Sequence, residues 1–255
     1  MSPAKITFYF DIISPFGYLA YYMFRNSPTF KPVQINCVPI LLGGLHKQCG
    51  NLAPIFIKNK STWINKERHR WADLFNIPLR KDAPPGFPIS TVNVMRALTA
   101  LHQDLNAASS SEGNAKFADA LEVLWAALWC PQSPVLLQST RKDAFDKVRD
   151  SAGEFDIKNP EILKALLAAV VGDELAEKSV RRTAEKDVKD GLIANTNRAF
   201  EVGAFGIPWY ECENEKGQCE GFWGFDHLGQ VVRFLGLDEK GDLGRDGGRE
   251  MRALL

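Results

Sequence analysis

The sequence predicts an α/β protein in which a helical block interrupts a mixed sheet. Residues 5–40 follow the order strand, helix, strand, and residues 188–238 follow the order helix, strand, strand, helix. Between them, residues 41–187 are rich in Ala, Leu, Lys and Glu, with few clusters of β-branched residues. Two strands on either side are too few for a stable sheet, so we expect both parts to meet in one sheet.

The first part predicts a β-α-β unit. Residues 5–13 (KITFYFDII) are almost wholly apolar, as is typical of a strand that is covered on both faces. Residues 17–25 (GYLAYYMFR) have helical apolar spacing, and residues 33–39 (VQINCVP) alternate as a strand does. The crossover between the two strands should be right-handed.

The middle block predicts several helices. Apolar residues recur at helical spacing in three stretches, residues 115–128, 141–149 and 161–171. Asn159-Pro160 predicts an N-cap with proline at the first helical position. Irregular loops are expected within residues 41–90, around Gly43-Gly44, Pro54 and Pro84-Pro85.

The last part predicts a helix over residues 186–202 and a hairpin. Residues 209–213 and 218–221 read as strands joined by the turn at 214–217. Asp226 is expected to cap a final helix over residues 228–235.

These boundaries divide the chain into a discontinuous domain, an insertion and a tail. We expect residues 1–43 plus 188–238 to form the sheet domain and residues 44–187 to form an inserted all-helical domain. The tail, residues 239–255, is charged and rich in glycine, and we expect it to be mobile.

Composition excludes several classes of protein. The 31 basic and 31 acidic residues cancel, so no global field favours nucleic acid or an anionic membrane. No apolar run approaches the roughly 18 residues of a membrane span. The strand that follows Met1 at once leaves no room for a signal or transit peptide, so we expect a soluble intracellular protein. The cytoplasm is its expected address; mitochondria and peroxisomes are alternatives, although Ala253-Leu254-Leu255 is only distantly similar to a Ser-Lys-Leu signal.

The cysteine pattern argues against a disulfide scaffold. The chain has 5 cysteines, an odd number with irregular spacing, and no Cys-x-x-Cys. Cys212 and Cys219 are expected to face each other across the hairpin, where we expect two free thiols rather than a disulfide in a reducing compartment. The 4 histidines show no metal-ligand spacing, so we expect no metal.

One pair of motifs indicates a thioredoxin-type site. The strand at residues 5–13 leads directly into Ser14-Pro15 and a helix, and Phe205-Gly206-Ile207-Pro208 precedes a distant strand. A redox protein would carry cysteine where this chain has Ser14. The pattern therefore favours the handling of a thiol that arrives with the substrate.

The same residues carry a family resemblance. The stretch FYFDIISPFGYLA resembles the opening of 2-hydroxychromene-2-carboxylate isomerases and kappa-class glutathione transferases, both offshoots of the DsbA-like branch of the thioredoxin superfamily. Further matches follow in the family's order: Gly50-Asn51 with Pro54, Lys60, residues 204–208 and residues 222–227. The resemblance spans about residues 5–236 and implies a thioredoxin-like sheet domain with an inserted all-helical domain. It also implies glutathione as co-substrate, a role in detoxification, and a homodimer.

By this resemblance, Ser14 would donate a hydrogen bond to the glutathione sulfur. A free thiol has a pKa near ~8.5, and a hydroxyl beside the positive end of a helix favours the thiolate. No neighbouring base is visible in the sequence that would make Ser14 a nucleophile. The alternative is that Ser14 only caps the helix, a position that serine favours.

The resemblance assigns the peptide part of glutathione to residues far along the chain. Ile207 would offer its backbone amide and carbonyl, and Pro208 would be cis, although trans proline is far commoner. Asp226 would bind the γ-glutamyl ammonium, or only cap the last helix. The transferases carry serine before this aspartate; here Phe225 leaves only its backbone N–H for the γ-glutamyl carboxylate.

Two further ligand contacts come from the segment after the second strand. Asn51 would approach the ligand near the sulfur or the second substrate, and Lys60 would pair with the glycine carboxylate. Lys58 and Lys66 compete for that role, and a solvated loop lysine is the alternative.

An apolar pocket for the second substrate is expected around Phe16, Trp63 and His227. His227 stands where the transferases often carry arginine. Trp63 fits a subunit interface equally well.

Three functions remain open on these residues. The leading hypothesis is a kappa-type glutathione transferase that conjugates or reduces a small apolar electrophile. The first alternative is a glutathione-dependent 2-hydroxychromene-2-carboxylate isomerase, and the second is a non-catalytic glutathione- or thiol-binding protein.

Overall fold

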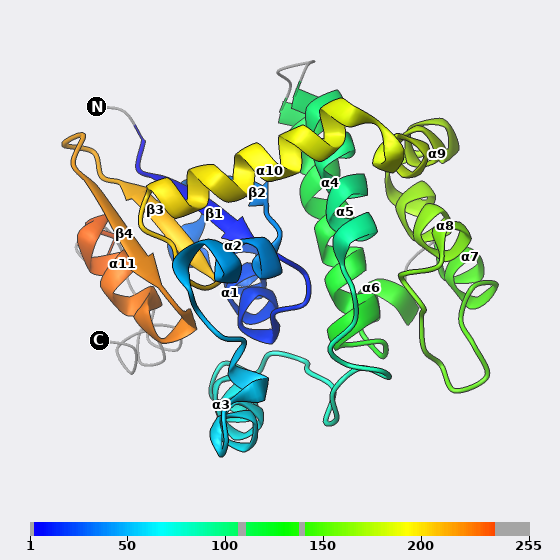
Figure 1. Ribbon diagram of the computed structural model, residues 1–255, viewed down its shortest axis with the longest axis horizontal. Helices are drawn as coiled ribbons and strands as arrows, with labels where there is room; N and C mark the ends of the chain where they lie inside the picture. Colours follow the sequence, from blue (N-terminus) through cyan, green and yellow to red (C-terminus); the bar gives the residue numbers. More distant parts are fainter. Residues whose placement is uncertain (1–2, 107–110, 138–140, 238–255) are drawn as a thin grey trace. The chain divides into compact units, whose positions relative to one another are not determined.

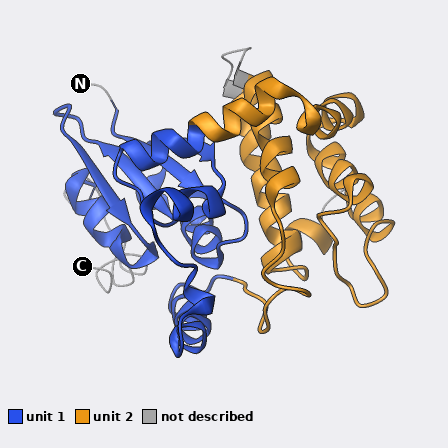
Figure 2. Ribbon diagram, viewed as in Figure 1, with its two compact units in different colours: residues 1–77, 195–255 blue, residues 78–194 orange. Residues whose placement is uncertain are grey.

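The computed structural model describes residues 3–106, 111–137 and 141–237, and it divides the chain into two compact units (Figures 1 and 2). The first unit comprises residues 1–77 and 195–255, and the second comprises residues 78–194. Residues 44–77, expected in the insertion, fall in the first unit; the predicted domain assignment stays a prediction. The expected tail, residues 239–255, lies outside the described residues.

The first unit contains a four-stranded mixed sheet in the order β2-β1-β3-β4. The strands are β1 (Lys5–Phe10), β2 (Gln34–Pro39), β3 (Trp209–Glu213) and β4 (Cys219–Trp223). β1 pairs with β2 in parallel and with β3 antiparallel, and β3 pairs antiparallel with β4. The two parts of the chain therefore meet in one sheet, as predicted, and the thioredoxin-like α/β fold with a helical insertion is confirmed.

Side chains alternate between the two faces of the sheet along β1, and the first face carries part of the core. Ile6, Phe8 and Phe10 are fully buried. Phe8 stacks on Tyr210 with ring centroids 5.9 Å apart and meets Phe24 of α1 (Pro15–Asn26) edge-on at 5.3 Å. Aromatic pairs at these distances stabilise a core beyond their buried area.

The opposite face packs against α2 (Leu42–Cys49) and the end of α10 (Lys186–Glu201) (Figure 1). Tyr9, Leu45, Ala199 and Trp209 share one buried cluster there. Residues 43–44 lie inside α2, so the irregular loop expected at this point is wrong. Buried Leu45 anchors the helix, and its capping groups come from distant segments.

Shorter elements complete the first unit. They are η1 (Pro28–Phe30), η2 (Pro54–Phe56), α3 (Lys60–Leu74), η4 (Phe225–His227) and α11 (Leu228–Phe234). Asp226 lies inside η4, and the residue that precedes α11 is His227, with no side-chain cap at either helix. The expected Asp226 cap is therefore wrong, because a 3₁₀ turn occupies the position where the cap was expected.

The hairpin register separates the two cysteines that were expected to face each other. Cys219 lies opposite Glu213, and Cys212 lies opposite Glu220. Since neighbouring residues of a strand point to opposite faces, Cys212 and Cys219 lie on different faces of the sheet. This geometry excludes a disulfide between them, and both are free thiols.

The described residues of the second unit form helices and no strand, which confirms the predicted helical block. They are α4 (Val92–Asn106), α5 (Ser111–Trp129), α6 (Pro134–Leu137), α7 (Lys142–Asp146), α8 (Pro160–Val171), α9 (Asp173–Arg181), η3 (Arg182–Ala184) and the first part of α10. Trp125, Trp129 and Leu166 are among its buried side chains. Asn159 caps α8 through a 2.9 Å bond from the Glu161 N–H, as predicted. No helix of the described residues is long and apolar enough to span a membrane.

Candidate functional site

One edge of the sheet brings together segments that are far apart in sequence. β1 and β2 end side by side there, with Phe10 opposite Pro39, and β3 begins there, with Trp209 opposite Tyr9. β4 ends at the same edge, since Trp223 lies opposite Trp209. The chain leaving β1 leads to Ser14, the chain leaving β2 leads through α2 to Asn51, Pro208 precedes β3, and Phe225 and Asp226 follow β4.

Ser14 is the N-cap of α1. Its Oγ accepts a 3.1 Å hydrogen bond from the Gly17 N–H, Pro15 occupies the first turn, and no acidic residue lies in that turn. The side chain is 7% exposed. A hydroxyl can accept and donate at once, and among the described residues no acceptor takes the Ser14 proton. Capping therefore leaves the donor function of Ser14 available.

The Ile207–Pro208 peptide bond is cis, as the resemblance implied. Ile207 and Pro208 are both buried. The Gly224 N–H donates to the Pro208 carbonyl over 2.9 Å, which ties the start of β3 to the turn after β4. Phe225 and Asp226 are thereby held beside Pro208.

Asn51 joins the same loop from the other side. It follows Gly50, the left-handed C-cap of α2, whose φ is 64°. Its Nδ2 donates to the Phe205 carbonyl over 2.8 Å, and its Oδ1 accepts from the Leu52 N–H at 2.8 Å. This side chain fixes the loop that precedes Ile207.

Asp226 and His227 form the polar end of this arrangement. The Asp226 Oδ1 lies 3.4 Å from His227 Nδ1, a distance that allows an ion pair only when the imidazole is protonated, and the two side chains are 58% and 37% exposed. Phe225 is buried and meets the ring of Trp71 at 5.7 Å. Its side chain supports α3, while the carboxylate of Asp226 stays accessible.

Among the described residues, the side chains of Lys60, Trp63 and Phe16 form no hydrogen bond, ion pair or ring contact with the residues above. Lys60 is the exposed first residue of α3, and Lys58 and Lys66 are exposed as well, so nothing singles out one of the three. Trp63 is 54% exposed and stacks under Arg70 at 5.3 Å. Phe16 is half-buried in the first turn of α1.

Asp11 and Gly224 were missed by the sequence analysis. Asp11 is 1% exposed, and its Oδ2 accepts from the Leu42 N–H at 3.2 Å. Gly224 has φ 90°, and a Cβ built on it would lie 2.4 Å from Asp226 Oδ1. The available sequence signal for Asp11 was an acidic residue at the end of an otherwise apolar strand. No sequence signal marked Gly224.

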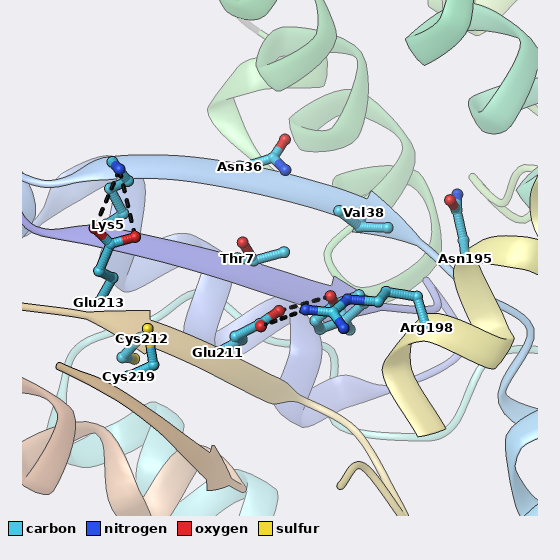
Figure 3. Close-up of a pocket in the computed structure, with 11 residues that line it drawn as sticks. Lys5, Thr7, Asn36, Val38, Asn195, Arg198, Glu211, Cys212, Glu213 and Cys219 are labelled. Carbon is cyan, nitrogen blue, oxygen red and sulfur yellow. Dashed lines mark hydrogen bonds and ion pairs between the residues drawn. The ribbon is translucent and has the colours of Figure 1, made fainter. Parts of the chain in front are cut away.

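A hollow of about 400 Å³ lies on the face of the sheet that carries Tyr9, beside Asn195 and Arg198 of α10, and none of the site residues above lines it (Figure 3). Its charged groups satisfy one another: Lys5 pairs with Glu213 at 3.3 Å, and Arg198 pairs with Glu211 at 2.8 Å. The Tyr9 hydroxyl donates to Glu211 at 2.9 Å. The candidate site therefore stays at the sheet edge.

The DSBA-like thioredoxin domain family matches residues 5–161, more than half of the chain. The chain belongs to this family. This DSBA-like chain is 28% identical to glutathione S-transferase kappa 1 of Caenorhabditis elegans, over 91% of its own length and 90% of the relative's. It is 24% identical to glutathione S-transferase kappa 1 of Rattus norvegicus, over 81% of its own length and 80% of the relative's.

A solved structure shares the fold. The 2-hydroxychromene-2-carboxylate isomerase superposes on this DSBA-like chain with a TM-score of 0.64 and 22% identity, covering 91% of this chain and 94% of the other.

Two cysteines of this DSBA-like chain, Cys37 and Cys212, are poorly suited to disulfide exchange. All 5 are free thiols. Burial raises the pKa of Cys37 to about 12, and burial together with the carboxylates of Glu220 and Glu211 raises the pKa of Cys212. A thiol with a raised pKa is a poor nucleophile near neutral pH. The described residues contain no cluster of His, Cys, Asp and Glu that could hold a metal ion.

Proposed function

We propose that this protein is a glutathione transferase of the kappa type. It binds glutathione at the sheet edge and either joins the glutathione sulfur covalently to a small apolar electrophile or uses glutathione to reduce that electrophile. The observation that carries the proposal is the convergence of Ser14, Asn51, the cis Ile207–Pro208 bond and Asp226 at this edge. The names of the curated relatives support the same class of reaction.

The Ser14 hydroxyl donates the hydrogen bond that stabilises the glutathione thiolate. The Gly17 N–H donates to the Ser14 oxygen and fixes its position, and the positive end of the α1 dipole adds a positive potential. Hydrogen bonding to the charged form lowers a thiol pKa, so the bound sulfur is ionised near pH 7. The thiolate, and not Ser14, attacks the electrophile.

The rest of the peptide lies along the edge. The backbone of Ile207 pairs with the cysteinyl unit, and Lys60 binds the glycine carboxylate. Asp226 binds the γ-glutamyl ammonium, while the Phe225 N–H binds the adjoining carboxylate. Phe16, Trp63 and His227 line the space for the electrophile, and two copies of the chain form a homodimer in the cytoplasm.

The decisive experiment compares two helix caps. Ser14→Ala and Asn159→Ala each remove a side-chain cap next to a proline, and each should cost about 1 kcal/mol of unfolding free energy. Only Ser14→Ala should raise the pKa of bound glutathione, by about one to two units, read from thiolate absorbance against pH. Wild-type protein that shows no glutathione binding by calorimetry would end the proposal.

A glutathione-dependent 2-hydroxychromene-2-carboxylate isomerase is the second candidate. The Ser14-Pro15-Phe16 and Phe222-Trp223-Gly224 motifs favour it. In this reaction the thiolate adds to the substrate reversibly and leaves again. Conversion of this carboxylate that depends on added glutathione, without net loss of free thiol, distinguishes isomerase from transferase. Glutathione binding without turnover of either substrate would instead indicate a non-catalytic thiol-binding protein.

A further inference from the structure

Asp11 connects the turn that carries Ser14 to the helix that leads to Asn51. Its Oδ1 accepts from the Ile13 N–H at 3.1 Å, and its own carbonyl accepts from the Ser14 N–H at 3.1 Å. These two bonds fold the chain between β1 and α1 into a tight Asx turn that ends at Ser14.

The second carboxylate oxygen of Asp11 holds a different helix. The Leu42 N–H, in the first turn of α2, donates to Oδ2 over 3.2 Å. The N-cap residue of α2 is Leu41, which offers no side-chain acceptor. Asp11 therefore acts as the cap of a helix that begins 31 residues later in the chain.

Thr196 provides a matched comparison at the same helix start. Its Oγ1 accepts from the Leu41 N–H at 3.1 Å, and the residue is 3% exposed. Both side chains satisfy backbone N–H groups at the beginning of α2. Asp11 in addition holds the Ser14 turn.

We propose that Asp11 is a positioning residue that fixes Ser14 against α2, and so against Asn51, around the glutathione sulfur. This inference rests on the proposed function. Its carboxylate is buried and takes backbone donors from both segments, so removing it frees the two segments to move apart. The Ser14 hydroxyl would then point at the sulfur for a smaller fraction of the time.

The test uses the full chain as wild type and as Asp11→Ala, Asp11→Asn and Thr196→Val. The pKa of bound glutathione is read from thiolate absorbance, the affinity from calorimetry, and the stability from urea unfolding. Asp11→Ala should raise the bound thiol pKa by about one unit, because the Ser14 hydrogen bond is weakened. Asparagine can close the same Asx turn, but its Nδ2 cannot accept from the Leu42 N–H, so Asp11→Asn should show a smaller rise than Asp11→Ala.

Thr196→Val should lower stability and leave the thiol pKa at the wild-type value. If Asp11 had a purely structural role, Asp11→Ala should behave in the same way. Equal thiol pKa values in Asp11→Ala and Thr196→Val would therefore overturn the inference. A fall of the thiol pKa in both Asp11 variants would overturn it as well, since the carboxylate would then act through its charge.

If Asp11→Ala does not fold, Asp11→Asn against Thr196→Val decides the matter: Asp11→Asn should still show a small rise of the thiol pKa, and no rise beyond Thr196→Val would reject the positioning role. Absence of glutathione binding by the wild type would overturn the proposed function and this inference together, before any variant is compared.

Discussion

Tyr210 carries a buried hydroxyl with no hydrogen-bond partner among the described residues. The residue is fully buried in the aromatic core of the first unit. Burial, with smaller contributions from Cys212 and Asp226, raises the pKa of Tyr210 well above its ordinary value, so the phenol stays neutral. An unsatisfied buried polar group lowers stability by about 1–3 kcal/mol.

Tyr210→Phe should therefore stabilise the protein. Removing the hydroxyl keeps the ring contacts with Phe8 and Phe24 and should raise the unfolding free energy by about 1 kcal/mol. Urea unfolding measures the change, and Tyr9→Phe is the matched control. Tyr9 donates to Glu211, so its variant should lose stability; a loss in both variants would contradict the account of Tyr210.

Glycine is required at position 224 because of its backbone conformation and because the Asp226 side chain lies close to it. Its φ of 90° is strained for any other residue, and a Cβ would lie 2.4 Å from the Asp226 carboxylate. Gly224→Ala should displace that carboxylate and weaken glutathione binding about tenfold, equivalent to about 1.4 kcal/mol.

Gly217 offers the control for this variant, because its φ is 76° and nothing lies within 4 Å of an added Cβ. Gly217→Ala should show a similar loss of stability and unchanged affinity for glutathione by calorimetry. Equal affinities for the two variants would show that Asp226 does not bind the ligand.

At the scale of elements, prediction succeeded where the signals were local. The turn at 214–217 and the alternation around it placed β3 at its observed bounds, Trp209–Glu213. Asn159-Pro160 placed the start of α8. α2 was missed because its capping groups, Asp11 and Thr196, come from segments that no local pattern connects to it.

In the candidate site, too, residues in local motifs could be predicted, whereas contacts between distant segments could not. Ser14 and Pro208 could be selected from sequence because each sits in a recognisable motif at a strand end. The bond from Asn51 to Phe205 joins residues 154 positions apart, and the Gly224 bond to Pro208 depends on the register of the sheet. Spacing along the chain carries no information about such contacts. The correction at Asp226 arose because a 3₁₀ turn and a helix start share the same residue preferences.

At the scale of the whole molecule, every residue proposed to bind glutathione belongs to the first unit. Leu166→Ala in α8 tests whether that assignment is complete. Leu166 is fully buried in the second unit, and its truncation should lower stability by about 3 kcal/mol. Glutathione affinity and the thiol pKa of the folded variant should equal those of wild type. A weakened affinity, measured by calorimetry under conditions where circular dichroism shows a folded protein, would place part of the binding site in the second unit.

The pairing of β1 with β3 has a consequence for how the protein is made. Lys5 of β1 pairs with Glu213 of β3, so β1 cannot complete its pairing in the sheet until β3 has left the ribosome. Ser14 is synthesised before the helical unit, whereas Pro208 and Asp226 are synthesised after it. Chains typically grow at about 5–20 residues per second, so a nascent chain that contains Ser14 spends on the order of ten seconds without Pro208 and Asp226. A product stalled before β3 would carry the serine proposed to stabilise the thiolate, without the Ile207 backbone and the Asp226 carboxylate proposed to hold glutathione beside it.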